Sequence, residues 1–246
     1  MFLELKNENG FKRNYFDTLK YRLAYASLEI EGIDDDLAKL TQSMKIFNQL
    51  NAINFVFSDK EKHENELSHF EFTNLVCEIA NLVSGGEISD FRKTQAIVQG
   101  SSVERSRASM IRNDLWYLID DYNYMVKNAK SMKELCEIEA IFHIRFLHIH
   151  PFEDSNGRTA RILLAYHMAK NNLAPCIITK ELKKEYCDYI ENNDIKGLAR
   201  MIEKLSQLEI KNMLTLYKDL NERGLIETNN MTKEQEEAYK VLKKQK

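Results

Sequence analysis

The stretch HPFEDSNGRTAR, residues 150–161, decides where the helices of this chain break. Pro151, one of only two prolines in the sequence, disfavours helical geometry at the residue before it. We therefore expect one helix to end near Ile149. Apolar residues resume at helical spacing beyond Gly157, so a second helix is expected from there to about Asn172. A histidine, two acidic residues, an Asn-Gly pair and two arginines are crowded into this stretch.

The rest of the chain has the composition of an all-α protein. Eight glycines and two prolines among 246 residues are few helix breakers. The spacing Ser131-x-x-Glu134 is a capping box that should open the helix before the break. Further helices are expected over residues 11–30, from Asp34 or Asp35 onward, and over 67–83, 103–127, 180–192 and 197–222.

Residues 87–102, EISDFRKTQAIVQGSS, differ from this pattern. Ala96 and Val98 alternate with polar neighbours, and a QGSS turn follows them. Such alternation before a turn favours extended or hairpin structure. An irregular loop is the alternative.

Bulk properties indicate a cytoplasmic protein. The net charge of −3 favours neither a nucleic-acid partner nor an anionic membrane, and the four cysteines lack CxxC spacing, as expected of reduced thiols. No apolar segment has the length of a signal peptide core or of a membrane span. We expect a helical core domain over residues 65–205, docked N-terminal helices over 1–64 and a C-terminal helical extension over 206–246. Whether the chain forms a homo-oligomer stays open.

The polar residues of the break would lie at the N-terminus of a helix. The first backbone N–H groups of a helix lack intrahelical partners and carry partial positive charge, so such an end binds phosphate. Asn156 adds a side-chain donor, and Gly157 allows a ligand to approach the backbone. Arg158 and Arg161 share one helix face, because they are three residues apart. Two guanidinium groups beside a row of amides suit a polyphosphate.

Three further residues add chemistry and support to this anion site. Asp154 is a hard carboxylate beside the expected phosphates, which is where proteins hold Mg²⁺. His150 has the pKa to accept a proton near neutrality. Phe152 is expected to anchor the loop in the core. Taken singly, each residue has an ordinary explanation as part of a turn, a surface or a core, but the combination favours an anion site with a base beside it.

The stretch from His150 to Arg161 resembles the signature loop of the Fic family, H-x-F-x-D/E-G-N-G-R-x-x-R. A weaker resemblance, in helix order, covers residues 67–205. The resemblance implies a small all-helical domain with a short β-hairpin flap, and the transfer of AMP from ATP to a protein hydroxyl. Ser155 departs from the pattern, since the family usually has glycine there. Serine keeps its backbone N–H but restricts the backbone angles and adds bulk near the phosphates, which puts the rate and the transferred group in question.

The resemblance also implies a role for each matching residue. His150 would take the proton from a Tyr, Ser or Thr hydroxyl of a target protein, and that oxygen would attack the α-phosphate of ATP. Asp154 would hold Mg²⁺ across the α- and β-phosphates, and Arg161 would bind the γ-phosphate. The residues that would cradle the phosphates are Ser155, Asn156, Gly157 and Arg158.

Three less specific matches lie outside the loop. Residues 87–103 stand where the family has its flap, which would pair with an extended piece of the target. A plain surface loop is the alternative there. Tyr186 and Asn193 loosely match the adenine-side positions of the family, and a core tyrosine and a helix-end asparagine are the plain alternatives. Self-modification on an exposed Tyr, Ser or Thr is a further expectation.

Residues 27–32, SLEIEG, fit the inhibitory pattern of the family, S/T-x-x-x-E-G/N, through Ser27, Glu31 and Gly32. If this helix docks on the loop, the carboxylate of Glu31 can pair with Arg161. That pair would occupy the arginine needed by the γ-phosphate. A helix end capped by Gly32 is the plain alternative, and both interpretations can hold together.

Two other functions compete with AMP transfer. One is the removal of AMP from a modified protein, with Glu31 positioning a water molecule. The other is a catalytically idle nucleotide-sensing protein, disabled by Ser155. A metal site built on His143, His148 and His150 is not expected, because a spacing of five does not place two imidazoles side by side on a helix. The arginines expected on solvated helix faces are Arg105, Arg107 and Arg112.

Overall fold

The computed structural model describes residues 9–32, 40–58, 66–98 and 101–223. These residues form α-helices and short 3-10 turns, with no strand among them, which confirms the all-α prediction. The helices are α2 Asn9–Ile30, α3 Leu40–Ser58, α4 His69–Ser84, α5 Ile111–Asn128, α6 Met132–Ile149, α7 Asn156–Lys170, α8 Lys183–Glu191 and α9 Ile195–Glu222. The 3-10 turns are Ala108–Met110 and Lys180–Leu182. The expected helix start at Asp34 or Asp35 and the expected domain boundary at residues 64 and 65 lie outside the described residues.

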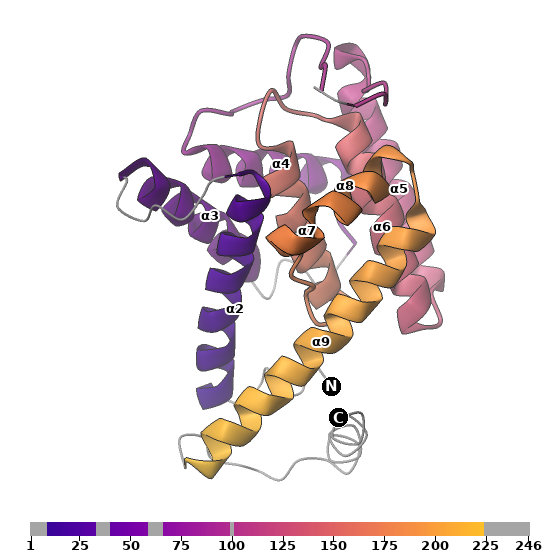
Figure 1. Cartoon of the computed structure of the whole chain (residues 1–246). Helices are drawn as coiled ribbons and strands as arrows, with labels where there is room; N and C mark the ends of the chain where they lie inside the picture. Colours follow the sequence, from indigo (N-terminus) through magenta and orange to yellow (C-terminus); the bar gives the residue numbers. More distant parts are fainter. Residues whose placement is uncertain (1–8, 33–39, 59–65, 99–100, 224–246) are drawn as a thin grey trace.

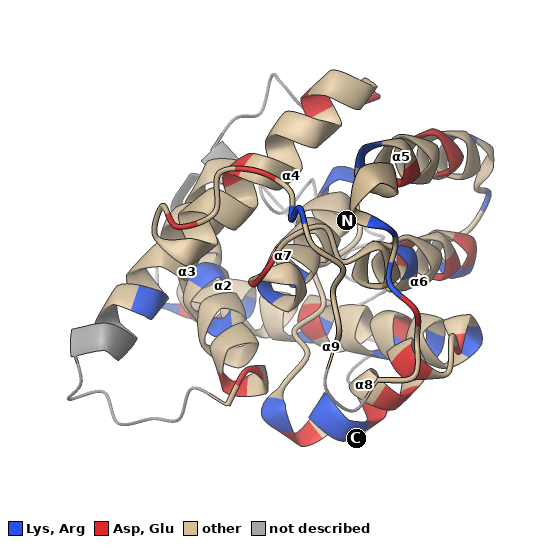
Figure 2. Ribbon diagram, turned by 90° about the horizontal axis from the view of Figure 1, so that it is seen from above, with Lys and Arg blue, Asp and Glu red and all other residues tan. Residues whose placement is uncertain are grey.

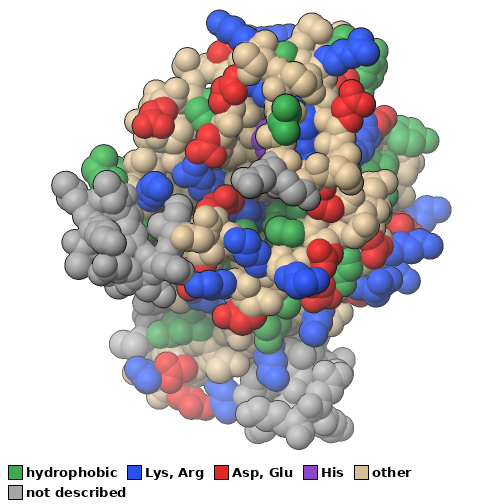
Figure 3. Space-filling model, turned by 45° about the horizontal axis from the view of Figure 1, so that its top comes forward, with side chains coloured by type: hydrophobic (Ala, Val, Ile, Leu, Met, Phe, Trp, Pro, Cys, Tyr) green, Lys and Arg blue, Asp and Glu red, His purple; other side chains and the backbone are tan. Residues whose placement is uncertain are grey.

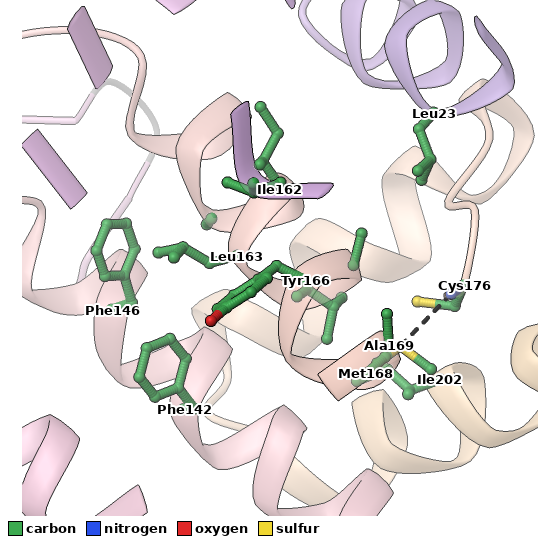
Figure 4. Packing of buried hydrophobic residues seen from close by; sticks show 14 of the residues in the cluster. Leu23, Phe142, Phe146, Ile162, Leu163, Tyr166, Met168, Ala169, Cys176 and Ile202 are labelled. Atoms are coloured by element: carbon green, nitrogen blue, oxygen red, sulfur yellow. Dashed lines mark hydrogen bonds between the residues drawn. The ribbon is translucent and has the colours of Figure 1, made fainter. Parts of the chain in front are cut away.

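Helix α7 is the central element of the fold. It lies among the other helices, with α2 and α3 on one side and α5 and α6 on the other (Figure 2). Almost every residue of α7 is buried, as expected of a helix enclosed on all sides. Phe142 and Phe146 of α6 lie beside Leu163 and Tyr166 of α7 (Figure 4). The core thus holds in place the helix whose first residues carry the candidate site.

The helix ends follow local sequence signals in most places. Helix α6 ends at Ile149 as predicted, and His150 caps it in the left-handed region at φ 53°. Ser131 opens α6 by accepting a hydrogen bond from the Glu134 backbone at 3.2 Å. The Glu134 carboxylate reaches the backbone N–H of Lys130 at 2.7 Å and not that of Ser131, so only half of the predicted capping box forms.

The segment between α4 and α5 differs from the hairpin that the resemblance implied. Residues 87–98 and 101–107 contain no strand, and the helix expected from residue 103 begins only at Ile111. Side chains of the segment occupy its own carbonyl groups. Arg92 donates to the carbonyls of Thr94 and Ser106, and Gln95 donates to that of Arg105 at 3.0 Å. Backbone groups engaged in this way are not free for a β-ladder or a helix, so the irregular loop is the observed outcome.

Helix α9 connects the core to the N-terminal helix. It runs unbroken through residues 205 and 206, where a C-terminal extension was expected to begin, and it packs on α6, α8 and α2. Figure 1 shows α9 crossing the molecule toward α2. Glu209 of α9, only 2% exposed, accepts from both terminal nitrogens of Arg22 at 2.8 Å and from the hydroxyl of Tyr15 at 3.0 Å. This bidentate pair anchors α2.

The described surface is mixed in charge. On the face seen in Figure 3, basic and acidic side chains are interspersed, which agrees with the mild net charge of −3. Within the described residues, no helix combines the length and the apolar character needed to cross a membrane.

We predict that Glu209→Ala lowers the free energy of unfolding by about 2 kcal/mol. Removing one partner of a fully buried ion pair costs roughly 3–5 kcal/mol. The loss should be smaller here, because the Arg22 side chain is 38% exposed. Denaturant unfolding followed by circular dichroism measures the change. Glu222→Ala on the same helix is the control, since its carboxylate is 64% exposed beside Lys218, and an equal loss in both variants would contradict the anchor.

Candidate active site

The loop between α6 and α7 is held by one buried arginine. Arg92, 3% exposed, donates from Nε to the carbonyl of His150 at 2.7 Å and from Nη2 to that of Ile149 at 3.2 Å. Its backbone N–H donates to the carbonyl of Pro151 at 2.9 Å. Three successive carbonyls are thereby fixed. Sequence reasoning missed Arg92, because no local pattern marks an arginine whose partner lies 58 residues away.

Asn156 closes the loop on itself. Its Oδ1 accepts from the backbone N–H of Phe152 at 2.9 Å, and its Nδ2 donates to the Phe152 carbonyl at 2.8 Å. Phe152 is fully buried, with its ring centroid 5.6 Å from that of Phe91. Both ends of the amide are used by the loop backbone, so Asn156 shapes the loop in this structure.

Ser155 stands in a left-handed backbone conformation at the start of α7, with φ 69° and ψ 5°. Glycine adopts this region without steric cost, which gives a physical reason for the glycine in the pattern that this loop resembles. Hydrogen bonds from Arg158 offset part of the steric cost of having serine at this position. Its Nη2 donates to the Ser155 hydroxyl at 2.8 Å and to Asp154 Oδ2 at 3.0 Å.

Arg161 joins the loop to the N-terminal helix. Its Nε donates to the Ser27 hydroxyl at 2.9 Å, and its Nη2 donates to the Ser27 carbonyl at 3.0 Å and to Glu31 Oε1 at 2.5 Å. Burial opposes the charge of this side chain, but Tyr186 and Glu31 outweigh it and raise the pKa of Arg161. The structure therefore brings together Ser27, Glu31 and Arg161 from distant parts of the sequence.

Gly157 leaves room for the carboxylate of Glu31 beside Arg161. A Cβ atom on Gly157 would lie 2.8 Å from Glu31 Oε1 and 3.1 Å from Arg161 Nη1, so a larger residue would push the pair apart. Gly32 ends the helical segment at φ 77°, a left-handed angle that favours glycine.

His150 lies at the other side of the loop and is uncharged at neutral pH. Burial, followed by the positive charges of Arg105 and Arg92, lowers its pKa to about 4. Arg105 was expected on a solvated helix face, and that expectation is wrong. It is 5% exposed, and its Nη2 donates to the Ser101 hydroxyl at 2.7 Å and pairs with Glu191 at 3.2 Å. Its partner Glu191 lies 86 residues away in the chain, so a local pattern cannot indicate the burial of Arg105.

Of Tyr186 and Asn193, which loosely match the adenine-side positions of the family, only Tyr186 lies in the candidate site. Tyr186 is 2% exposed, and its hydroxyl lies 2.7 Å from His143 Nε2. Burial raises the pKa of Tyr186 to about 12, although the neighbouring charge of Arg161 opposes this shift. Asn193 lies exposed in the turn between α8 and α9, where its backbone N–H donates to the Ile190 carbonyl at 3.2 Å.

The start of α7 is suited to anions and a divalent cation. Ser155 makes no side-chain capping bond, and a helix start leaves backbone N–H groups without intrahelical partners. The side chain of Asp154 is 83% exposed beside them. No group of three or more His, Cys, Asp or Glu side chains converges in the part of the chain that the structure describes. One exposed carboxylate still fits Mg²⁺, which completes its coordination with substrate phosphates and water.

Comparison with known sequences finds similar proteins for part of the chain. Residues 66–168 match the model of the Fic/DOC family. Among curated proteins, the chain is similar to a protein adenylyltransferase Fic of Culex quinquefasciatus, with 32% identity over 124 residues that cover 49% of this chain and 23% of that protein. A probable protein adenylyltransferase of Aquifex aeolicus is 26% identical over 214 residues, covering 81% of this chain and 63% of that protein.

Solved structures agree on the fold. A Fic domain containing signaling protein from Bacteroides thetaiotaomicron superposes with a TM-score of 0.71 at 17% identity, covering 87% of this chain and 93% of that one. Fic-1 from C. elegans superposes with a TM-score of 0.70 at 19% identity, covering 87% of this chain and 68% of that one. The match to the Fic/DOC family model covers residues 66–168, and the solved structures share the helical fold over a larger part of the chain. The chain spans about a quarter of the length of the insect relatives that it matches.

We predict that Ser155→Gly is more stable than Ser155→Ala by roughly 1 kcal/mol, because alanine keeps the Cβ atom in the left-handed region. Both variants lose the hydroxyl that accepts from Arg158, so this loss cancels in the comparison. Thermal unfolding of the two variants measures the difference. Equal stabilities would contradict the strain inferred from φ.

We predict that the imidazole of His150 titrates near pH 4, and that Arg105→Met moves its pKa up toward the ordinary value of about 6.5. Burial should keep part of the depression. Two-dimensional NMR of the imidazole signals measures both midpoints. Arg107→Met is the control, because Arg107 is exposed in the same segment. A wild-type midpoint near 6.5 would refute the assignment of His150 as a neutral base.

Proposed function

We propose that this protein transfers AMP from ATP to a hydroxyl group of a target protein, and that Glu31 inhibits this transfer. The observation that carries the proposal is the pairing of Glu31 with Arg161 of α7, the helix that follows the loop with His150 and Asp154. The match of residues 66–168 to the Fic/DOC family model and the names of the curated relatives support the same reaction.

The chemical step begins at His150. Its neutral imidazole accepts the proton of the target hydroxyl, and the hydroxyl oxygen forms a bond to the α-phosphorus of ATP. The bond from that phosphorus to the oxygen bridging to the β-phosphate breaks, and pyrophosphate leaves with the electron pair. Because the low pKa keeps His150 uncharged at pH 7, the base is ready before substrate binds.

The phosphates would be held by the start of α7. Free backbone N–H groups and Arg158 would stabilise the negative charge that develops in the transition state. Asp154 would hold Mg²⁺, which supplies charge neutralisation when bound. Arg92 and Asn156 keep the loop in one shape, and nucleotidyl transfer depends mainly on such positioning.

Glu31 would act by competing with ATP. Its carboxylate occupies Arg161 and lies over Gly157, where the third phosphate of ATP would need the guanidinium group. A bidentate or charge-assisted contact of this kind is among the stronger hydrogen bonds of proteins. ATP would then bind with its α-phosphate out of line, and transfer would be slow until α2 moves.

The target would approach along residues 87–98 and 101–107. Ile97 in this segment is 93% exposed, so an apolar contact is presented close to the loop. An extended piece of a target could align along this irregular segment and bring a Tyr, Ser or Thr hydroxyl to His150. The same proposal includes three further points: the protein modifies itself, it forms a homo-oligomer, and it is located in the cytoplasm.

We predict that Glu31→Gly raises AMP transfer at least tenfold over wild type, because Arg161 becomes free for ATP. His150→Ala should abolish transfer and leave ATP binding within about twofold. Purified proteins incubated with Mg²⁺ and α-labelled ATP, followed by counting label on protein, measure the rates. Glu29→Gly is the matched control, since it places the same glycine in the same helical turn and leaves the Glu31–Arg161 pair in place.

Other outcomes would select the competing functions. Loss of label from a pre-modified target, abolished by Glu31→Gly, would favour removal of AMP over its transfer. Nucleotide binding in every variant with neither reaction, and with Ser155→Gly restoring transfer, would favour a nucleotide-sensing protein. Equal rates of AMP transfer by wild type and Glu31→Gly would refute inhibition by Glu31.

A further inference from the structure

Three buried side chains from three different helices are connected by hydrogen bonds. They are Arg161 of α7, Tyr186 of α8 and His143 of α6. The Tyr186 hydroxyl lies 2.7 Å from Nε2 of His143. The guanidinium group of Arg161 also hydrogen-bonds the side chain of Tyr186. The Tyr186 hydroxyl is therefore placed between a cation and an imidazole.

The chemistry of these groups fixes which one donates at each step. A guanidinium group can only donate, so the Tyr186 hydroxyl accepts from Arg161 and has its own proton left for Nε2 of His143. Burial, followed by the charge of Arg161, lowers the pKa of His143 to about 3, so the imidazole is uncharged at pH 7 and can accept. A hydrogen bond to the backbone of Ala160 opposes this shift, as expected when a ring N–H donates to a carbonyl group.

Tyr186 differs from the other side-chain partners of Arg161 in the element that carries it. Ser27 and Glu31 belong to α2 and the turn that follows it, and their contacts are lost when α2 moves away. Tyr186 and its partner His143 belong to α8 and α6, so their contacts do not depend on α2. A buried guanidinium group requires partners, and Tyr186 supplies one whether or not α2 is docked.

We propose that His143 and Tyr186 are positioning residues, which hold the guanidinium group of Arg161 in place for the third phosphate of ATP once α2 has withdrawn. The inference rests on the proposed function in one respect, the use of Arg161 by that phosphate. His143 acts only through Tyr186, because it takes the hydroxyl proton and so leaves an oxygen lone pair directed at Arg161. This role lies on the phosphate side of the nucleotide, whereas the sequence match of Tyr186 suggested the adenine side.

Binding of ATP and ADP by Glu31→Gly tests this role, because only ATP carries the third phosphate. Glu31→Gly alone should bind ATP about tenfold more tightly than ADP, as expected of one hydrogen-bonded charge contact. Adding Tyr186→Phe, which removes the hydroxyl and keeps the ring, should lower this ratio to about twofold by weakening ATP binding. Isothermal titration calorimetry with Mg²⁺ measures both affinities.

Tyr122→Phe in the same background is the matched control. Tyr122 is also a buried tyrosine, and its hydroxyl donates to Glu139 at 2.7 Å. Loss of a buried hydrogen bond that only stabilises the fold should affect ATP and ADP alike, so the ratio should stay at the value of Glu31→Gly alone.

Two substitutions at His143 test whether it acts through Tyr186. His143→Gln should keep most of the preference for ATP, because the amide oxygen can accept the Tyr186 proton. His143→Leu offers no acceptor and should lower the ratio as Tyr186→Phe does. If His143→Leu does not fold, Tyr186→Phe and its control decide the question.

NMR of the Arg161 guanidinium group tests the support without nucleotide. In Glu31→Gly, rotation of this group about its Nε–Cζ bond should become about fivefold faster when Tyr186→Phe is added, since one hydrogen bond no longer resists it. Tyr122→Phe should leave the rotation rate unchanged.

Unchanged rotation in Tyr186→Phe, or an ATP preference that survives this substitution, would overturn the inference. Equal binding of ATP and ADP by Glu31→Gly alone would instead contradict the proposed use of Arg161 by ATP. The rotation rates would then still decide whether Tyr186 and His143 hold the Arg161 side chain.

Discussion

The contact of Arg161 with Ser27 and Glu31 is the constraint on which the rest of the structure depends. Arg161 is buried near the start of the central helix α7, and a buried guanidinium group requires partners. The N-terminal helix α2 supplies three of them at 2.5–3.0 Å. The same side chain would be needed by the terminal phosphate of ATP. One arginine therefore connects the docking of α2 with the proposed catalysis, and the two uses compete.

The shape of the loop has a separate origin. Arg92 fixes the carbonyls of three successive residues from outside, and Asn156 closes the loop from inside. His150 is therefore held in a left-handed conformation in a partly buried place, and burial with nearby arginines keeps it neutral. A neutral imidazole and the start of α7 are positioned by the same framework. The proposed base and the proposed anion site thus share one support.

Helix α9 holds another part of α2. Glu209 anchors one part of α2 through Tyr15 and Arg22, and the residues that contact Arg161, Ser27 and Glu31, lie five and nine residues beyond Arg22. Helix α2 is thus held by polar contacts at two places along its length.

The sequence by itself determined the helical class, the break at Pro151 and the residues of the candidate site. Scarce helix breakers, the capping residue Ser131 and the motif from His150 to Arg161 are local signals, which act through nearby backbone geometry. Only the tertiary structure decided that Arg92 and Arg105 are buried, that residues 87–98 form no hairpin and that Asn156 binds its own loop. The burial of Arg92 and Arg105 depends on partners 58 and 86 residues away in the chain, because a buried charged group must find its hydrogen bonds wherever the fold offers them.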